Sequence, residues 1–276
     1  MKNTGKLIQE LRIQAGFTQK TLADALHITD KAISKWERGL AFPDVALLPK
    51  LSLLLDTDVE VLLSKTIGQE EWVGLINIKG CDFSQKIYDK PLVYYLLSHF
   101  MLVGIRHIHS ITTEENQAYL DSPVFQELGF HFSYTLPEGH PLMIINHPWF
   151  IFGSDLTHQI QGAMLSGRDT KLEPMNQEPV IFFVRESKTY FSDRMDMAIS
   201  KTLGRGMVCL DMSDNDKVLD VASFVRTYQK NSSLLIGSLE EIAYSKGIIV
   251  KQQLIELAKE TSYGLQLLAL TKPQVG

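Results

Sequence analysis

Two patterns of apolar and polar positions follow one another along the chain. Up to about residue 65, apolar residues recur three and four positions apart, the spacing that gives a helix one apolar face. Thr18 and either Thr29 or Asp30 are good N-caps, Gly39 is a good C-terminal stop, and residues 27–28 fit a tight turn. The spacing predicts five helices, at residues 4–15, 19–26, 30–38, 44–55 and 59–63. The second and third, joined by the tight turn, form a predicted helix-turn-helix unit.

Beyond residue 71, short apolar runs alternate with segments of helical spacing. Strands are predicted at residues 73–78, 107–112, 130–134, 142–146 and 180–184. Helices are predicted at residues 91–103, 155–165, 218–230, 238–246 and 250–257. This alternation indicates a mostly parallel sheet with helices on both faces. We therefore expect a multidomain chain: a helical domain at residues 1–65, a linker at 66–71 and an α/β domain at 72–276.

The third predicted helix carries a cationic face. Lys31, Lys35 and Arg38 are spaced to lie on one side of it, away from the apolar side formed by Ile33 and Trp36. Cationic side chains on one exposed helix face suit a phosphate backbone and the guanine edge in a major groove. An ordinary solvated helix would carry the same charges, so this face alone does not decide between the two interpretations.

The amino-acid sequence of this region indicates a protein family more specifically than its charge does. Residues 18–39 read TQKTLADALHITDKAISKWERG, and PDVALLPKLSLLL follows from Pro43. Residues 3–64 closely resemble the Cro/repressor-type (XRE) helix-turn-helix family, which implies an all-α, five-helix, lambda-repressor-like domain that binds a double-stranded DNA operator. Arg12 and Glu37 match the position of that family's internal ion pair.

The resemblance also implies which residues contact DNA. Gln19 would hold a phosphate at the N-terminus of its helix, and Arg38 would contact the backbone. Asp30 could accept a hydrogen bond from a cytosine amino group or simply cap its helix. The residues predicted to contact DNA are Thr18, Gln19, Thr29, Asp30, Lys31, Ser34, Lys35 and Arg38.

Composition narrows the partners further. The whole chain has a net charge of −5, which by itself argues against nucleic acid. Residues 1–65 hold nine basic and eight acidic residues, so DNA binding would depend on local placement of charge. Cys81 and Cys209 are isolated, without the spacing of a zinc finger or a disulfide framework, which fits a reducing cytoplasm. No apolar run is long enough for a membrane span, so we expect a cytoplasmic protein without a membrane partner.

Three segments of the second region resemble another family in the right order. They read YDKPLVYYLLSHFMLVGIRHI from Tyr88, GRGMVCLDMSDNDKVLDVASFV from Gly204, and SLEEIAYSKGIIVKQQLIELA from Ser238. They are similar to sugar-phosphate nucleotidylyltransferases such as glucose-1-phosphate thymidylyltransferase. The resemblance implies a Rossmann-like fold of the nucleotide-diphospho-sugar transferase type.

The chain differs from that family at the positions of the catalytic residues. Attack of a sugar phosphate on a nucleoside triphosphate needs a glycine-rich loop, an arginine, a lysine and metal-binding carboxylates. Residues 79–84 after the first strand contain one glycine, and the family's catalytic lysine falls near Asp82. Its Gly-Asp-Asn metal motif falls at residues 147–149, so only the second metal carboxylate survives, as Asp211. We therefore predict no catalytic residues, no metal, no cofactor and no enzymatic activity.

Several residues could have either a ligand-binding role or a purely structural one. Trp149 could stack on the base of a ligand or belong to the core, and Asp211 could be an inherited ligand residue or a helix cap. His107 and His109 share one face of a predicted strand, but no third metal ligand is evident, so surface or core histidines account for them.

These observations lead to a functional expectation. We expect a sequence-specific DNA-binding transcriptional regulator with a degenerate nucleotidylyltransferase-like domain for oligomerisation, sensing of a nucleotide or nucleotide sugar, or both. A homodimer or higher oligomer would form through residues 238–246 and 250–257. The alternative is an active sugar-phosphate nucleotidylyltransferase fused to a DNA-binding domain, and the missing glycine loop argues against it. A scaffold that pairs with a separate enzyme subunit is a third interpretation.

Overall fold

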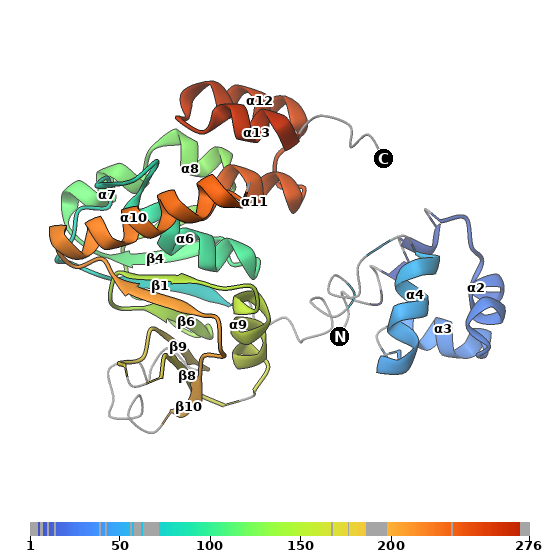
Figure 1. Cartoon of the computed structure of the whole chain (residues 1–276). Helices are drawn as coiled ribbons and strands as arrows, with labels where there is room; N and C mark the ends of the chain where they lie inside the picture. Colours follow the sequence, from blue (N-terminus) through green and yellow to red (C-terminus); the bar gives the residue numbers. More distant parts are fainter. Residues whose placement is uncertain are drawn as a thin grey trace. The chain divides into compact units, whose positions relative to one another are not determined.

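A computed structural model shows two compact units, residues 1–70 and 71–276 (Figure 1). It describes residues 5, 8, 9, 11–13, 15–38, 40, 41, 43–55, 57, 62, 72–166, 168–175, 177–185, 198–232 and 234–270. The predicted linker at 66–71, Gly39 and most of the predicted fifth helix lie outside these residues. Among the described helices, none is long and apolar enough to cross a bilayer.

The first unit contains the predicted helix-turn-helix. Residues 5, 8, 9 and 11–13 are helical, as the first predicted helix requires. The elements that follow are α2 (Gln19–Leu26), α3 (Asp30–Glu37), the 3-10 turn η1 (Val45–Leu47) and α4 (Leu48–Leu54). The fourth helix therefore begins later than expected. Pro49 has no N–H to donate inside a helix that begins at residue 44, but it fits the first turn of α4; the preceding residues close a tighter turn, from the Leu47 N–H to the Asp44 carbonyl at 2.8 Å.

Local chemistry fixes the turn between α2 and α3. Thr18 and Thr21 form a capping box at the start of α2, and His27 ends that helix in the left-handed region with φ 58°. Thr29 is the N-cap of α3, because its side chain accepts the Ala32 N–H, so the alternative cap at Asp30 is wrong. Asp30 is the first helical residue, and its carboxylate accepts the neighbouring N–H of Lys31.

The second unit is built on a seven-stranded sheet with the order β10-β8-β9-β6-β1-β4-β5. Its strands are β1 (Val73–Asn77), β4 (His107–Ile111), β5 (His131–Ser133), β6 (Leu142–Ile145), β8 (Thr170–Glu173), β9 (Ile181–Val184) and β10 (Ile199–Thr202). Four neighbouring pairs are parallel, and β9 pairs antiparallel with both β6 and β8. The prediction of a mostly parallel sheet is therefore confirmed.

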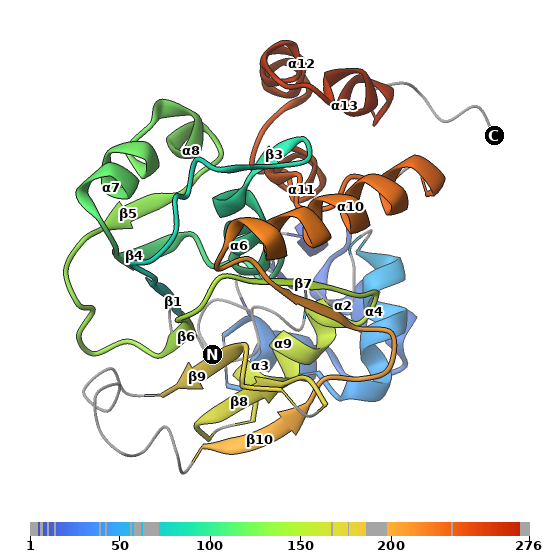
Figure 2. The ribbon, with the colours of Figure 1, turned by 60° about the vertical axis from the view of Figure 1, so that its left-hand side comes forward.

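Two small ribbons and eight helices complete the described part of this unit. The antiparallel ribbons pair β2 (Lys86–Ile87) with β3 (Lys90–Pro91), and β7 (Trp149–Phe152) with β11 (Val208–Asp211). The helices are α6 (Leu92–Leu102), α7 (Glu114–Leu120), α8 (Pro123–Glu127), α9 (Leu156–Met164), α10 (Asn215–Asn231), α11 (Leu239–Ser245), α12 (Lys251–Glu260) and α13 (Gly264–Leu270). Figure 2 shows α10 lying along β7, where Tyr228 packs against Phe152 with ring centroids 4.7 Å apart. The helices and strands predicted for this unit are all present, whereas α7, α8, α13, β8, β10 and both ribbons were not predicted.

The helices gather in one core rather than two. Strand residues such as Ile76, Met143 and Ile145 form a single apolar cluster with the buried residues of the helices. On the opposite sheet face, the described cluster contains strand residues only: Val73, Leu75, Leu142, Ile144 and Val184. Among the described residues, the expected helices on both faces are therefore not found. The crossovers β1–α6–β4 and β4–α7–α8–β5 run in the same direction, so both deliver helices to the same face.

Candidate functional site

The outer face of α3 is exposed and cationic. Lys31, Lys35 and Arg38 are exposed, together with the N-terminal Thr29 and Asp30. On the opposite side of the helix, buried residues pack into the core of the first unit; these are Ile33 and Trp36, with Leu22 and Leu26 of α2. Ser34 is half-buried. The structure thus leaves the cations predicted to contact DNA together on one solvent-facing surface.

A buried ion pair stands behind this face. The guanidinium of Arg12 contacts the carboxylate of Glu37, with Nε and Oε1 2.5 Å apart, and both residues are 8 % exposed. Gln19 donates from its amide Nε2 to Glu37 Oε2 at 2.6 Å, and Arg12 also donates to the Phe17 carbonyl. The predicted internal ion pair is present and joins the first helical segment to the end of α3, while Gln19 joins the start of α2 to the same carboxylate. Because the Gln19 amide is bound to Glu37, its implied phosphate contact stays a prediction.

Several backbone N–H groups of the loop after β1 are hydrogen-bonded within the protein. Asp82 Oδ1 accepts the backbone N–H of Ser84 at 2.9 Å and its hydroxyl at 2.6 Å. The Gln85 N–H donates to the Asp82 carbonyl, and the Phe83 N–H donates to Asn116 Oδ1 at 2.9 Å. Three successive backbone donors are therefore satisfied within the protein and do not point to a phosphate.

A cavity of about 760 Å³ lies beside this loop. The loop after β1 forms one wall, and the segment around the start of α7 forms the other. The lining residues are Lys79, Gly80, Cys81, Asp82, Ser84, Thr113, Glu115, Asn116, Ala118 and Tyr119. Asn116 joins the two, since it also donates to the Cys81 carbonyl at 2.9 Å. The sequence analysis missed this half of the site. Its available signal was Thr113 followed by two glutamates, a typical start of a helix, and Thr113 is indeed the N-cap of α7.

Asp211 lies at the end of β11, directly opposite Trp149 of β7. Its Oδ1 accepts from His147 Nε2 and from the Ser213 N–H, both at 2.8 Å, and its Oδ2 accepts from Lys217 Nζ at 2.8 Å. Burial alone would raise the pKa of this carboxyl group, but the hydrogen bonds from Lys217, His147 and Ser213 lower it to about 2. The N-cap of α10 is Asp214, so the interpretation of Asp211 as a helix cap is wrong.

The metal implied by the resemblance does not fit this arrangement. Both oxygens of Asp211 are already occupied by donors, one of which is the ammonium of Lys217. Within the described ranges, no group of three or more His, Cys, Asp or Glu residues could hold a metal ion. The sequence pattern indicates Asp211 but not Lys217, which lies six residues further along the chain.

The remaining predicted residues lie apart from the cavity. Trp149 is half-buried, and its ring lies 5.0 Å from that of His147, centroid to centroid; neither lines the cavity beside the β1 loop. His107 stacks on His131 of the neighbouring strand, while His109 Nδ1 lies within hydrogen-bond distance of the Thr135 carbonyl. The two histidines of β4 thus contact different partners rather than one shared site.

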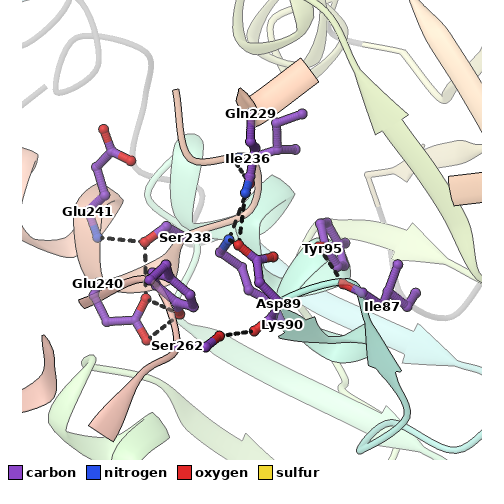
Figure 3. Close-up of polar contacts among 11 residues, drawn as sticks. Ile87, Asp89, Lys90, Tyr95, Gln229, Ile236, Ser238, Glu240, Glu241 and Ser262 are labelled. Carbon is purple, nitrogen blue, oxygen red and sulfur yellow. Dashed lines mark hydrogen bonds and ion pairs between the residues drawn. The ribbon is translucent and has the colours of Figure 1, made fainter. Parts of the chain in front are cut away.

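A buried polar network anchors the C-terminal helices (Figure 3). Lys90 is fully buried, and its Nζ lies 2.8 Å from Asp89 Oδ2, 3.3 Å from Gln229 Oε1 and 4.0 Å from the centre of the Tyr263 ring. Burial lowers the pKa of Lys90, against the effect of Asp89. Tyr263 donates to Glu240, which is 1 % exposed. The network therefore joins the β2–β3 ribbon to α10, α11 and the segment before α13.

Comparison with known proteins agrees with the division into two units. Residues 8–62 match a family model described as helix-turn-helix. The HTH-type transcriptional regulator ImmR of Bacillus subtilis is 31 % identical over 93 residues, which cover 33 % of this chain and 73 % of that protein.

The second unit has different relatives. The glucose-1-phosphate thymidylyltransferase of Neisseria meningitidis is 27 % identical over 262 aligned residues, which cover 67 % of this chain and 90 % of that enzyme. The one from Mycolicibacterium smegmatis is 26 % identical, with 67 % and 89 % covered. A solved structure of a proposed glucose-1-phosphate thymidylyltransferase from Bacillus anthracis, in complex with a sucrose, covers 56 % of this chain and 95 % of its own at 11 % identity. Its TM-score is 0.42.

The first unit thus has the fold, the exposed cationic helix and the internal ion pair of a DNA-binding module, and its sequence matches known regulators. The second unit resembles nucleotidyltransferases in sequence. The chain belongs to the helix-turn-helix transcriptional regulator family, with a nucleotidyltransferase-like domain joined to its DNA-binding domain.

Proposed function

We propose that this protein is a sequence-specific transcriptional regulator whose second unit has no nucleotidyltransferase activity. That unit holds the regulator as a homodimer or higher oligomer, senses a small molecule related to the sugar or nucleotide ligands of its relatives, or does both. The alternative, an active nucleotidyltransferase fused to a DNA-binding domain, requires chemistry that the β1 loop does not offer.

The β1 loop is the observation that carries the proposal. A triphosphate needs several free backbone N–H groups and nearby cations. Here the N–H groups of residues 83–85 are used within the protein, and Asp82 adds a negative charge to the same loop. A carboxylate at this position repels phosphate, so it raises the barrier to transfer instead of lowering it.

The Asp211 cluster supports the same conclusion independently. An ammonium bonded to Asp211 neutralises the carboxylate that the resemblance assigns to a metal. Lys217 also contacts Asp214 at 3.0 Å, so its charge is shared between two carboxylates. The cluster is a self-contained link between the β7–β11 ribbon and α10, and it requires no ion from solution.

The C-terminal helices support the proposed oligomer. A single helix-turn-helix contacts too little DNA for high specificity, and repressors of this type bind two half-sites about one helical turn apart. Leu267 of α13 is fully buried on one side, whereas Leu265 on the other is 86 % exposed. A helix that is apolar on both sides is normally covered on both. The Lys90 network holds this helix in place, so it offers a rigid surface to a second copy.

Selection from a random duplex library with the full chain tests the DNA-binding part of the proposal. We expect enrichment of inverted half-sites whose centres lie about one helical turn apart. An Arg38→Ala variant should recover the same sequences with lower yield, because a phosphate contact carries no base information. Recovery of unrelated sequences, or of single half-sites only, would contradict the proposed dimeric regulator.

A further inference from the structure

The cavity beside the β1 loop has the position and size of a ligand site. Its two walls follow β1 and β4, which are adjacent and parallel. The cavity thus lies at the sheet edge formed by the carboxyl ends of the strands, the edge at which open α/β sheets bind their ligands. A volume of about 760 Å³ lies within the range of small-molecule pockets.

The walls of the cavity are fixed before any ligand arrives. Asn116 is 3 % exposed and makes three hydrogen bonds, to the Phe83 N–H, the Cys81 carbonyl and the Thr112 hydroxyl, at 2.8 to 2.9 Å. The ring of Tyr119 packs edge-on against buried Phe125, with centroids 5.8 Å apart. Because these groups are already ordered, a ligand would lose little binding energy to ordering them.

The charges around the cavity oppose a phosphate. Asp82 and Glu115 contribute two carboxylates to the lining, against the single ammonium of Lys79. The backbone donors of the loop, which a phosphate would need, are already bound. A nucleotide or sugar phosphate would therefore meet net negative charge and no free cluster of N–H groups.

The same lining suits hydroxyl groups. A sugar hydroxyl both donates and accepts, so it can donate to the exposed carboxylate of Glu115 and accept from the ammonium of Lys79. Among the described residues, neither the Lys79 ammonium nor the Tyr119 hydroxyl has a hydrogen-bond partner. The half-buried ring of Tyr119 adds an aromatic surface for the apolar face of a sugar ring.

We propose that this cavity binds an uncharged saccharide, recognised through its hydroxyl groups rather than through a phosphate. The inference rests on the proposed sensing role of the second unit and names the ligand class for it. In this inference the protein recognises a sugar, and a nucleotide is not part of what it recognises.

Heteronuclear NMR titration of the full chain tests the proposal with defined probes: D-glucose, N-acetyl-D-glucosamine and L-rhamnose. We expect at least one of them to shift the amide signals of residues 79–84 and 113–119 and to saturate at millimolar concentration or below. D-glucose 1-phosphate and dTDP-glucose should bind more weakly than the best neutral sugar. Glycine, which carries both charges without hydroxyl groups, should cause no shift.

Three variants connect the signal to the cavity. Glu115→Gln replaces a charged acceptor by a neutral amide and Tyr119→Phe removes a hydroxyl group, both with little change of shape, and each should weaken binding of the best sugar by roughly threefold to tenfold. Glu114→Gln removes the adjacent exposed carboxylate of α7, which is not among the lining residues, and should leave affinity unchanged.

The possible outcomes separate this inference from the proposed function. If none of the three neutral sugars binds, or if both phosphorylated probes bind more tightly than all of them, the inference is overturned. Equal loss in Glu114→Gln and Glu115→Gln would also overturn it. DNA binding and pyrophosphate release are measured separately, so these results leave the proposed regulator intact unless those assays fail too.

Discussion

The two units treat their polar groups in opposite ways. On α3 the cations Lys31 and Lys35 are exposed and make no ion pair within the described residues, while the charges that hold the helix, Arg12 and Glu37, are buried behind them. In the second unit, the polar groups at the positions that the resemblance assigns to chemistry are bonded to neighbouring protein groups. Asp82 binds Ser84, and Asp211 binds Lys217 and His147.

We propose that this difference marks a fold shared with the relatives without their activity. A group that acts on an external partner must keep a donor, an acceptor or a charge available for it. The exposed face of α3 meets that condition, whereas the backbone N–H groups of residues 83–85 in the β1 loop and the carboxylate of Asp211 do not. We therefore propose that the sequence similarity of the second unit to thymidylyltransferases reflects a shared scaffold without shared activity, whereas the first unit keeps exposed cations on α3 available for a partner.

The largest effect is expected from the ion pair that supports α3. Glu37→Ala would leave the Arg12 guanidinium buried and unpaired, which costs on the order of 3–5 kcal/mol. Thermal unfolding of the full chain should show a lower transition temperature for the first unit and an unchanged one for the second. Asp24→Asn, which removes an exposed carboxylate from α2, is the matched control and should stay within about 0.5 kcal/mol of the wild type. A small loss in Glu37→Ala would show that the pair does not support the helix.

Assembly through α13 should give the next largest effect. Leu265→Lys places a charge at the exposed apolar position, so sedimentation should show a monomer and affinity for paired half-sites should fall by about a hundredfold. Leu219→Lys changes a leucine of α10 that is 64 % exposed and should leave both measurements unchanged. If Leu265→Lys remains a dimer, the oligomer forms elsewhere.

Substitutions at the DNA-contacting residues should change DNA affinity by intermediate amounts, and they should differ in whether sequence specificity also changes. Lys35→Ala should weaken binding to the selected sequence by about 1–3 kcal/mol and relax its specificity, while Arg38→Ala should weaken all sequences alike. Gel-shift titrations at several salt concentrations distinguish the two. Lys50→Ala, in the exposed part of α4, serves as the control. Unchanged affinity in both α3 variants would contradict the assigned DNA-binding face.

The Asp211 cluster should give the smallest effect, visible as a pH dependence. Its carboxyl group has a pKa lowered from 3.8 to about 2 in the folded protein, so its stabilising effect is complete above pH 4 and is lost as the pH falls towards 2. After allowance for solvent screening, the linked stability is about 1 kcal/mol.

Comparison of variants isolates this contribution. The difference in unfolding free energy between wild type and Asp211→Asn should shrink as the pH falls through this window. The exposed Asp220→Asn in α10 should show no such trend. A difference that stays constant with pH would show that the carboxylate charge contributes nothing to the cluster.

Much of the fold could be predicted because local signals agree with the tertiary structure. Thr18, Thr29 and the apolar spacing of α2 and α3 give the helix-turn-helix, and largely buried runs give β1, β6 and β9. The strands β8 and β10 were missed because their sequences are polar: all four residues of β10 are exposed. The single-faced helical layer was missed because strand order, rather than strand sequence, sets the side on which each crossover lies.

The candidate site was predictable only in part. The family resemblance could identify Asp82 as a departure from the family's catalytic lysine and Asp211 as a retained carboxylate. It could not show that Asn116 closes the β1 loop from 33 residues away, or that Lys217 places its ammonium on Asp211. Such pairings depend on tertiary contacts between segments whose own patterns are unremarkable.

The central claim is that the second unit keeps its fold without the chemistry of its relatives, and pyrophosphate release tests it most directly. The full chain is incubated with each nucleoside triphosphate, hexose 1-phosphates and magnesium, with the Asp211→Asn variant in parallel. Loss of even one well-placed donor costs such a reaction about 100- to 1,000-fold, and here several are bonded internally. The account predicts release no faster than without protein. Turnover by the wild type that disappears in Asp211→Asn would contradict it and identify an active enzyme.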